Sequence, residues 1–492
     1  MRSVGSAMRV RGAVMMPRLW SAAIAVLVLL SAATGGRLQA ASLTLSPQAV
    51  TLVPGATYQF TARGSRGKIS WSATGGTITG SGLYKAGALP GSFIVRVADK
   101  SSSVTAAVTI TAAAPPVTIY PGDLVPIYPG ESIQAAVDTH AAGTGFLIRS
   151  GVHRQQSVRP KEGMSFIGES GAVLDGENVA PYAFQAHLVN SVTIRGLRVT
   201  RYAPPNLTAA VDAVETMGWI LEDNEIDSNS NGLLRVYGVR LGSWGIVRRN
   251  KIHHNGWVGI SGYKAIETLI EGNDIYANPA TSITDTVGEA ANIKLYGCGR
   301  ITIRDNYVHD GAFRGIWLDR SQPDMTIESN RVINHGQQGI WYEVSYRGII
   351  RNNYVDNAGY DSYYSSGWLR GGGISVTNSP DVSVIGNTVV NSLNGIIGLQ
   401  AAGYYDGPYG KNELRNLLVQ GNTIVMQRGQ TGIAENIGSS AVFLSWNNRF
   451  EGNQYQLHTI PKPFYWMSLS LDEVEWQAYG QDPPASSASF AR

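Results

Sequence analysis

The chain contains a single cysteine, Cys298, among its 492 residues. A lone cysteine excludes an internal disulfide, so the stability of the fold must come from packing. Because Cys298 follows a predicted strand, we expect a buried side chain rather than a nucleophile. Charged residues are also scarce, at 15% of the chain, whereas glycine is abundant at 57 residues. This composition is typical of a turn-rich, all-β protein.

Net positive charge is almost absent outside the first forty residues. The formal net charge is +3, and residues 1–40 hold five arginines and no acid, so subtracting those five charges leaves −2 for the remainder. A nearly neutral chain gives no basis for binding to nucleic acid. A Gly-rich phosphate-binding motif is also missing. We therefore expect no nucleic-acid partner.

Long hydrophobic runs are confined to residues 20–30. The apolar core of this run is too short to span a bilayer, and a basic segment precedes it. Small residues at Ala40-Ala41 offer a cleavage site. We therefore interpret residues 1–40 as a signal peptide, with an uncleaved anchor as the alternative. The mature protein is expected to be secreted or at the cell surface, with no membrane partner after signal cleavage.

A repeat of about 24 residues is the strongest positive feature. Gly315-Ile316-Trp317-Leu318-Asp319 is followed by Gly339-Ile340-Trp341-Tyr342-Glu343. A motif Asn-x-[Ile/Val] recurs at Asn224, Asn250, Asn273, Asn306, Asn330, Asn353, Asn387 and Asn422, and in looser form at Asn448. A fixed period of this size is typical of a solenoid, and stacked inward asparagines can share amide hydrogen bonds. We predict a right-handed parallel β-helix, which resembles the pectate-lyase-like superfamily over roughly residues 125–460.

The repeat divides the chain into regions. Residues 42–113 contain about seven short strands with alternating hydrophobicity, which predicts a small β-sandwich. Their sequence resembles bacterial group-2 immunoglobulin-like repeats, and this resemblance implies a module that acts as a spacer. Residues 114–130 are a predicted linker, and residues 131–460 the β-helix, whose first coil is covered by a helix over 131–140. Residues 461–492 are predicted to form a cap helix, opened by a capping box from Ser470 to Glu473, and a disordered tail.

Aromatic and charged residues replace the usual small polar ones on the outward face of four successive coils. Alternation with period two turns these side chains away from the core. Paired outward indoles are costly unless something covers them, and sugar rings have apolar faces that lie on indoles. We therefore predict a groove for a polysaccharide or oligosaccharide, with long aromatic insertions beside it. The candidate substrate-binding residues are Trp317, Trp341, Lys294, Tyr296, Tyr263, Arg320, Trp368 and Tyr404.

Asp319 and Glu343 are the candidate catalytic residues. On neighbouring strands they are expected about 4.7–4.9 Å apart, close to the roughly 5–5.5 Å between the two carboxyl groups of a retaining glycosidase. The phrases around them resemble β-helical β-xylosidase-type glycoside hydrolases. This resemblance implies an Asp319 nucleophile and a Glu343 acid/base. The alternative for the pair is a solvated acidic ladder, or one acid bridged to Arg320 or Arg347.

Other functions remain open at this stage. A polysaccharide lyase or uronate epimerase would use basic residues, often with calcium, but no calcium-loop spacing is present. A cell-surface or matrix protein that binds glycan without cleaving it is the non-enzyme alternative. The histidines at 253, 254, 309 and 335 sit at turns of coils that are only partly adjacent, so we expect no zinc. We expect no cofactor and a monomer.

Overall fold

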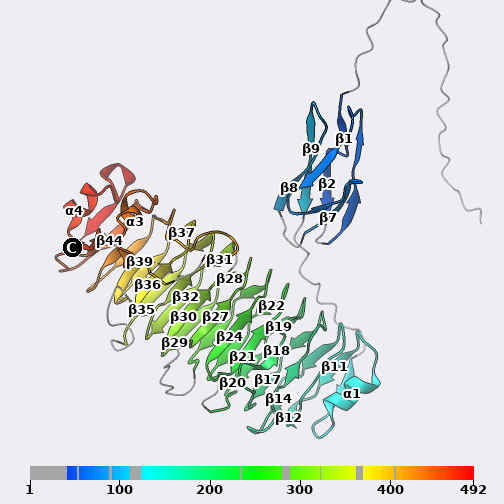
Figure 1. Cartoon of the computed structure of the whole chain (residues 1–492). Coiled ribbons are helices and arrows are strands. Elements are labelled where there is room, and N and C mark those ends of the chain that lie inside the picture. The colour runs from blue at the N-terminus through cyan, green and yellow to red at the C-terminus, as the bar shows by residue number, and fades with distance from the viewer. Residues whose placement is uncertain are drawn as a thin grey trace, which may run out of the picture. The chain divides into compact units, whose positions relative to one another are not determined.

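The computed structural model of the chain (Figure 1) describes residues 42–52, 55–87, 91–110, 124–232, 235–279, 289–321, 323–361, 370–403 and 406–491. The predicted signal peptide lies outside these ranges. The chain divides into two compact units, Met1–Ala112 and Ala113–Arg492. Among the described residues, no helix combines the length and the apolar character that a membrane crossing requires.

The regular elements in the described part of the first unit are all strands. They are β1 (Thr44–Ser46), β2 (Ala49–Leu52), β3 (Thr57–Gln59), β4 (Thr61–Arg63), β5 (Ser70–Ala73), β6 (Gly76–Ile78), β7 (Leu83–Ala86), β8 (Gly91–Ala98) and β9 (Ser103–Ile110). They form sheets in the orders β2-β9-β8-β5, β3-β7-β6 and β1-β4 around a core that includes Phe60, Tyr84 and Val95. Trp71 is partly buried against this core. The immunoglobulin-like assignment stays a prediction.

The second unit is a solenoid of three long parallel sheets (Figure 1). The first sheet contains β10 (Val125–Ile127), β11 (Gly145–Ile148), β13 (Ser165–Gly168), β16 (Thr193–Arg195), β19 (Ile220–Glu222), β22 (Ile246–Arg248), β25 (Leu269–Glu271), β28 (Thr302–Arg304), β31 (Met325–Glu328), β34 (Gly348–Arg351), β37 (Val382–Ile385), β40 (Leu418–Gln420) and β43 (Arg449–Glu451). From β13 to β45, each coil gives one strand to each of the three sheets.

The second sheet contains β12 (Gly151–Arg154), β14 (Ala172–Asp175), β17 (Arg198–Thr200), β20 (Glu225–Asp227), β23 (Lys251–His253), β26 (Asp274–Tyr276), β29 (Tyr307–Gly311), β32 (Arg331–His335), β35 (Tyr354–Ala358), β38 (Thr388–Val390), β41 (Thr423–Val425), β44 (Gln454–Gln456) and β47 (Ser489–Ala491). The third contains β15 (Phe184–Gln185), β18 (Ala209–Asp212), β21 (Tyr237–Leu241), β24 (Val258–Tyr263), β27 (Ala291–Tyr296), β30 (Arg314–Asp319), β33 (Ile340–Glu343), β36 (Gly372–Thr377), β39 (Asn394–Gln400), β42 (Thr431–Glu435), β45 (Phe464–Trp466) and β46 (Leu469–Leu471).

The core of the solenoid is a stack of inward aliphatic side chains. Ile293, Ile316 and Ile340 are register partners on successive strands of the third sheet, and all three are fully buried. Because successive side chains of a strand point to opposite faces, the residues between them face outward. The alternation that builds the core therefore also places a regular column of side chains on the outer surface.

An inward asparagine ladder runs along one turn of the coils. From Asn224 to Asn453, each side-chain amide donates to the Oδ1 atom of the next member at 2.9–3.1 Å, and the last bond goes to Asp482. The predicted members through Asn422 all take part. Asn448 does not, because its amide is bonded to the backbone of Leu414 and Leu417.

The two ends of the solenoid differ from the prediction. Helix α1 (Ile133–Thr139) lies where a covering helix is expected. The first sheet begins earlier than predicted, because β10 lies within the predicted linker and pairs with β11. At the other end are α3 (Ala441–Leu444), α4 (Glu473–Ala478) and the 3₁₀ helix η1 (Pro484–Ser486). The capping box of α4 uses Asp472 and Glu475 rather than Ser470. The tail predicted to be disordered forms β47, which pairs with β44.

Candidate functional site

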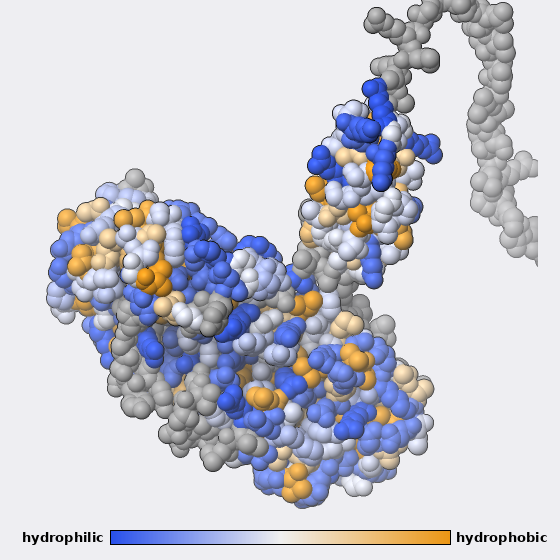
Figure 2. Space-filling model, viewed as in Figure 1, coloured by the Kyte–Doolittle hydropathy of each residue, from blue (hydrophilic) through white to orange (hydrophobic). Residues whose placement is uncertain are grey.

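The predicted site residues lie in two outward columns of the third sheet. Tyr263, Tyr296, Asp319 and Glu343 are successive register partners on β24, β27, β30 and β33. The neighbouring column, two residues earlier on the same strands, is Ser261, Lys294, Trp317 and Trp341. Asp319 and Glu343 therefore project from adjacent hydrogen-bonded strands on the same face. Figure 2 shows hydrophilic residues over most of the visible face of the solenoid, with hydrophobic ones scattered among them.

The two indoles are stacked on one another rather than laid open to solvent. The ring centroids of Trp317 and Trp341 are 5.0 Å apart with an interplanar angle of 13°. The Nζ atom of Lys294 lies 3.6 Å from the centroid of the Trp317 ring, and only 5% of Trp317 is exposed. The prediction of an open indole platform is therefore wrong for Trp317, because neighbouring strands bring a cation and a second ring against its two faces.

Lys294 and Asp319 form a largely buried ion pair. Nζ of Lys294 and Oδ2 of Asp319 are 3.7 Å apart, and their side chains are 10% and 15% exposed. Burial raises the pKa of Asp319, and the positive charges of Lys294 and Arg320 oppose that shift. Burial likewise lowers the pKa of Lys294, against the charge of Asp319. The two shifts bring the pKa values of the ammonium and the carboxyl group closer together.

Glu343 is held by an indole. The Nε1–H of Trp317 donates to Oε2 of Glu343 at 2.9 Å, and the glutamate is only 6% exposed. The indole of Trp341 donates in the same way to the hydroxyl of Thr377 at 2.9 Å. The two tryptophans thus position the polar groups of the site. The outward alternation in the sequence predicts the location of these rings but not this role.

A pocket of about 590 Å³ opens beside Lys294 on the same sheet. Three predicted substrate-binding residues line it, namely Lys294, Tyr296 and Tyr263. Sequence reasoning missed the other polar and aromatic lining residues, which are Arg235, Tyr237, Arg240, Trp257, Ser261 and Glu289. The signal for Glu289 was present in the sequence, since this residue lies in the long insertion of residues 279–291. No repeat pattern marks Arg235 or Trp257, because both lie at the edges of turns.

The remaining predicted residues are not brought into this pocket. Arg320 is exposed just after β30, where its charge lowers the pKa of Asp319 and its backbone N–H donates to the carbonyl of Glu343 at 3.1 Å. Arg347 pairs with Asp324 at 3.1 Å instead of with a candidate catalytic residue. Trp368 and Tyr404 lie outside the described residues.

Cys298 is fully buried, and burial raises the pKa of its thiol to about 12. A thiol with such a pKa is protonated at neutral pH and is a poor nucleophile. The cysteine therefore serves as core packing beneath β27, as predicted.

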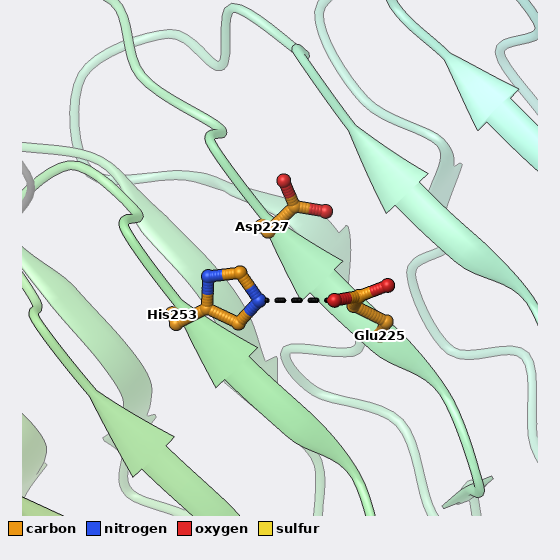
Figure 3. Close-up of side chains that lie close together, drawn as sticks. All are labelled: Glu225, Asp227 and His253. Atoms are coloured by element: carbon orange, nitrogen blue, oxygen red, sulfur yellow. Dashed lines mark hydrogen bonds and ion pairs between the residues drawn. The ribbon is translucent and has the colours of Figure 1, made fainter.

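Two carboxylates and an imidazole lie close together on the outer face of β20 and β23 (Figure 3). The ligand atoms of Glu225, Asp227 and His253 lie within 4.8 Å of one another. However, Arg198 donates two hydrogen bonds to Asp227, at 2.9 and 3.1 Å, and Nζ of Lys251 lies 3.6 Å from Glu225. These cations neutralise the carboxylates and would repel a divalent ion. We interpret the cluster as an ion-pair network and propose no metal there.

Comparisons with known proteins concern the solenoid. Residues 185–346 and 283–406 match the family model described as the right handed beta helix region. The A-module of mannuronan C-5 epimerase AlgE6 from Azotobacter vinelandii is 13% identical, with 73% of this chain and 94% of that one covered and a TM-score of 0.47. No curated protein sequence matches the chain.

Two further solved structures are also similar to this chain. The catalytic unit of an α-1,3-glucanase from Streptomyces thermodiastaticus strain HF3-3 is 11% identical, covers 81% of this chain and 76% of its own, and has a TM-score of 0.39. PfbA, a surface adhesin of Streptococcus pneumoniae, is 11% identical and also has a TM-score of 0.39. The match covers 66% of this chain and 80% of PfbA. A fold by itself does not decide activity. Three continuous parallel sheets and the matched family model establish the second unit of this chain as a right-handed parallel β-helix.

Proposed function

We propose that this protein hydrolyses glycosidic bonds, with Asp319 and Glu343 as its two carboxyl groups. The observation that carries the proposal is their register: they are Cα partners on β30 and β33, and both side chains face outward. Strands of a sheet are about 4.7–4.9 Å apart, close to the roughly 5–5.5 Å separation of the carboxyl groups in retaining glycosidases. A pair at that spacing suits a mechanism with a covalent glycosyl-enzyme intermediate.

The surroundings of the pair support chemistry rather than a solvated acidic ladder. Asp319 and Glu343 are both largely buried, whereas the acids of a surface ladder would face water. Lys294 and the indole N–H of Trp317 each contact one of the two carboxylates, at 3.7 and 2.9 Å. Groups held in this way are preoriented for a reaction, and their different partners give the two acids different tendencies to hold a proton.

The test of this function is a product assay on plant and bacterial glycans. We expect wild-type protein to release new reducing ends without absorbance near 235 nm, and the substitutions Asp319→Asn and Glu343→Gln each to reduce the rate at least about 10³-fold. Full activity in either variant would overturn the assignment of the pair. Glycan binding without turnover by the wild type would show a binding protein instead of an enzyme.

The roles within the pair are tested with an aryl glycoside that carries an activated leaving group. We propose Asp319 as the nucleophile and Glu343 as the acid/base. An activated leaving group departs without protonation, so Glu343→Gln should retain formation of the glycosyl-enzyme, whereas Asp319→Asn should not. Burial raises the pKa of Asp319, which by itself would favour a proton donor, whereas the ammonium of Lys294, 3.7 Å away, favours the carboxylate that a nucleophile requires. The opposite pattern, with Asp319→Asn active on this substrate, would exchange the two roles.

A polysaccharide lyase or uronate epimerase is the second candidate, and Lys294 is the observation that favours it. Burial lowers the pKa of its amine, and a neutral amine can remove a proton next to a carboxylate. A lyase would produce unsaturated products absorbing near 235 nm, and Lys294→Met would abolish that absorbance. An epimerase would change the stereochemistry of a uronate without cleaving the chain.

We also propose that the protein acts outside the cytoplasm. The basic segment and short apolar run in residues 1–40 support export. Fractionation of cells producing the full chain, with N-terminal sequencing of the product, tests this proposal. Retention of an intact N-terminus in the cytoplasm would overturn it.

A further inference from the structure

The pocket beside Lys294 has an apolar rim and a polar wall. Tyr263 and Tyr296 stand on adjacent strands with ring centroids 6.0 Å apart, and the residues are 47% and 37% exposed. The opposite wall is formed by Arg235 and Glu289, whose side chains are 33% and 39% exposed. Aromatic carbon next to accessible charged oxygen and nitrogen atoms matches the two kinds of surface that a sugar ring presents.

Every cation among the described lining residues has a carboxylate partner. Arg235 lies 3.1 Å from Glu289, Arg240 lies 3.1 Å from Asp212, and Lys294 lies 3.7 Å from Asp319. The formal charges of these six side chains cancel. The pocket therefore offers no net attraction to an anion, although it contains three basic side chains.

Glu289 links two of these pairs into one chain of alternating charge. Its Oε2 atom lies 3.1 Å from Arg235 and 4.0 Å from Nζ of Lys294, which in turn contacts Asp319. The carboxylates of Glu289 and Asp319 thus both lie within 4.0 Å of the same ammonium group. Glu289 is the more exposed of the two, with 39% of its side chain accessible compared with 15% for Asp319.

Such a chain of charges discriminates between neutral and acidic sugars. A hydroxyl group can donate to a carboxylate and accept from a neighbouring cation, so it fits between the members of an existing pair without separating them. A uronate carboxylate can only accept. It would have to compete with Glu289 and Asp319 for their cations, and displacement of Asp319 would leave that acid largely buried without compensation.

We propose that this pocket binds a neutral sugar unit of the substrate, beside the bond cleaved at Asp319 and Glu343, and that Glu289 selects it by binding its hydroxyl groups. The position beside the cleaved bond rests on the proposed function, whereas the preference for neutral sugars does not. Binding and turnover can therefore be measured and can fail separately.

The test uses the full chain carrying Glu343→Gln, which slows turnover and changes no residue that lines the pocket. Calorimetry compares two sets of hexasaccharides, one of neutral glucose, xylose or mannose units and one of galacturonate or mannuronate units. We expect at least one neutral ligand to bind, with an affinity that changes little between low and high salt. Adding Glu289→Gln should weaken the binding of that ligand about tenfold, as expected for the loss of hydrogen bonds to a charged group.

The same substitution should strengthen binding of the uronate ligands, because it leaves Arg235 and Lys294 with one carboxylate fewer. Tyr296→Ala should also weaken the neutral ligand, whereas Tyr354→Ala is a matched control on the second sheet, equally exposed at 37%. Tighter binding of uronates than of any neutral sugar by the Glu343→Gln chain would overturn the proposal, as would no neutral binding or an unchanged affinity after Glu289→Gln. Loss of turnover in Asp319→Asn together with any of these results would leave the hydrolase standing and remove only the pocket assignment.

Discussion

The ammonium group of Lys294 lies 3.6 Å from the ring centroid of Trp317 and 3.7 Å from the carboxylate of Asp319. One side chain therefore contacts both an aromatic ring that holds Glu343 and the acid beside it. Few single residues in the described solenoid connect so many parts of the site. Its removal is the most informative change at the scale of one residue.

We predict that Lys294→Met raises the pKa of Asp319, because the substitution removes the positive charge that most strongly favours the carboxylate. The limb of the pH profile of kcat/KM that reports Asp319 should move to higher pH, and kcat/KM at neutral pH should fall more than about tenfold. Lys251→Met, on the second sheet, is the control. An unchanged limb in Lys294→Met would show that this ammonium does not govern the ionisation of Asp319.

His335 gives a second prediction at this scale. Its ring is fully buried, Nε2 lies 3.0 Å from the amide of Asn292, and Nδ1 finds no partner among the described residues. Burial lowers the pKa of His335 from its ordinary value of 6.5 to about 3. The unfolded chain therefore binds a proton at this histidine that the folded chain does not bind. The free energy of unfolding consequently falls as pH decreases from 6.5 towards 3.

The measurement is the urea midpoint of the solenoid between pH 7 and pH 4. We expect the wild type to lose roughly 1.4 kcal/mol per pH unit from this histidine in that window, and His335→Gln to lack that part of the pH dependence. His140→Gln, near the end of α1, provides the control for an unrelated histidine. Parallel pH dependences in wild type and His335→Gln would contradict the prediction.

The asparagine ladder is the feature to test at the scale of an element. Asn330 accepts from the backbone N–H and the side-chain amide of Asn306 and donates to Asn353 and to the carbonyl of Ile303. We predict that Asn330→Ala lowers the free energy of unfolding by about 3 kcal/mol, since several buried donors and acceptors lose their partner. Gln454→Ala, an exposed amide in β44, should change it by less than about 0.5 kcal/mol. Equal effects in denaturant melts would show that the ladder adds nothing to stability.

The sequence predicts most of this element because its members have a regular offset from the following strand. It fails at Asn448, where the last coil has two asparagines five residues apart and only Asn453 faces the ladder. A second ladder, Asn229-Asn255-Asn278-Asn292, was not recognised. Its spacing shortens to 14 residues between Asn278 and Asn292, because Asn292 lies near the start of β27, the strand that follows Asn278 in the chain.

The candidate site shows the same division. Lys294, Tyr296, Asp319 and Glu343 could be predicted because period-two alternation decides which residues of a strand face outward. Glu289 could not be predicted in the same way, since the repeat defines the strands but not the path of the long connections. The burial of Trp317 could not be predicted from the alternation either, because it depends on the conformation of the Lys294 side chain one coil earlier.

At the scale of the whole molecule, the two units have separate hydrophobic cores. We predict that residues 113–492, produced without the first unit, fold with the same thermal midpoint as the solenoid in the full chain. They should retain turnover within about twofold on soluble oligosaccharides, because compact units with their own cores fold alone. Calorimetry and the reducing-end assay check both statements. A solenoid that precipitates or unfolds earlier would show that its stability requires the first unit.

The asparagine ladder also gives the solenoid a direction. Every side-chain amide of the ladder donates towards the C-terminal end, so the group dipoles add along the axis as they do in an α-helix. The positive end of this column meets the carboxylate of Asp482, which accepts from Asn453 at 3.1 Å. The carboxyl oxygen of Asp482 thus supplies the last acceptor of the column. A further coil stacked on Asp482 would need another acceptor at its own end, because the side chain of Asp482 has no amide with which to continue the ladder.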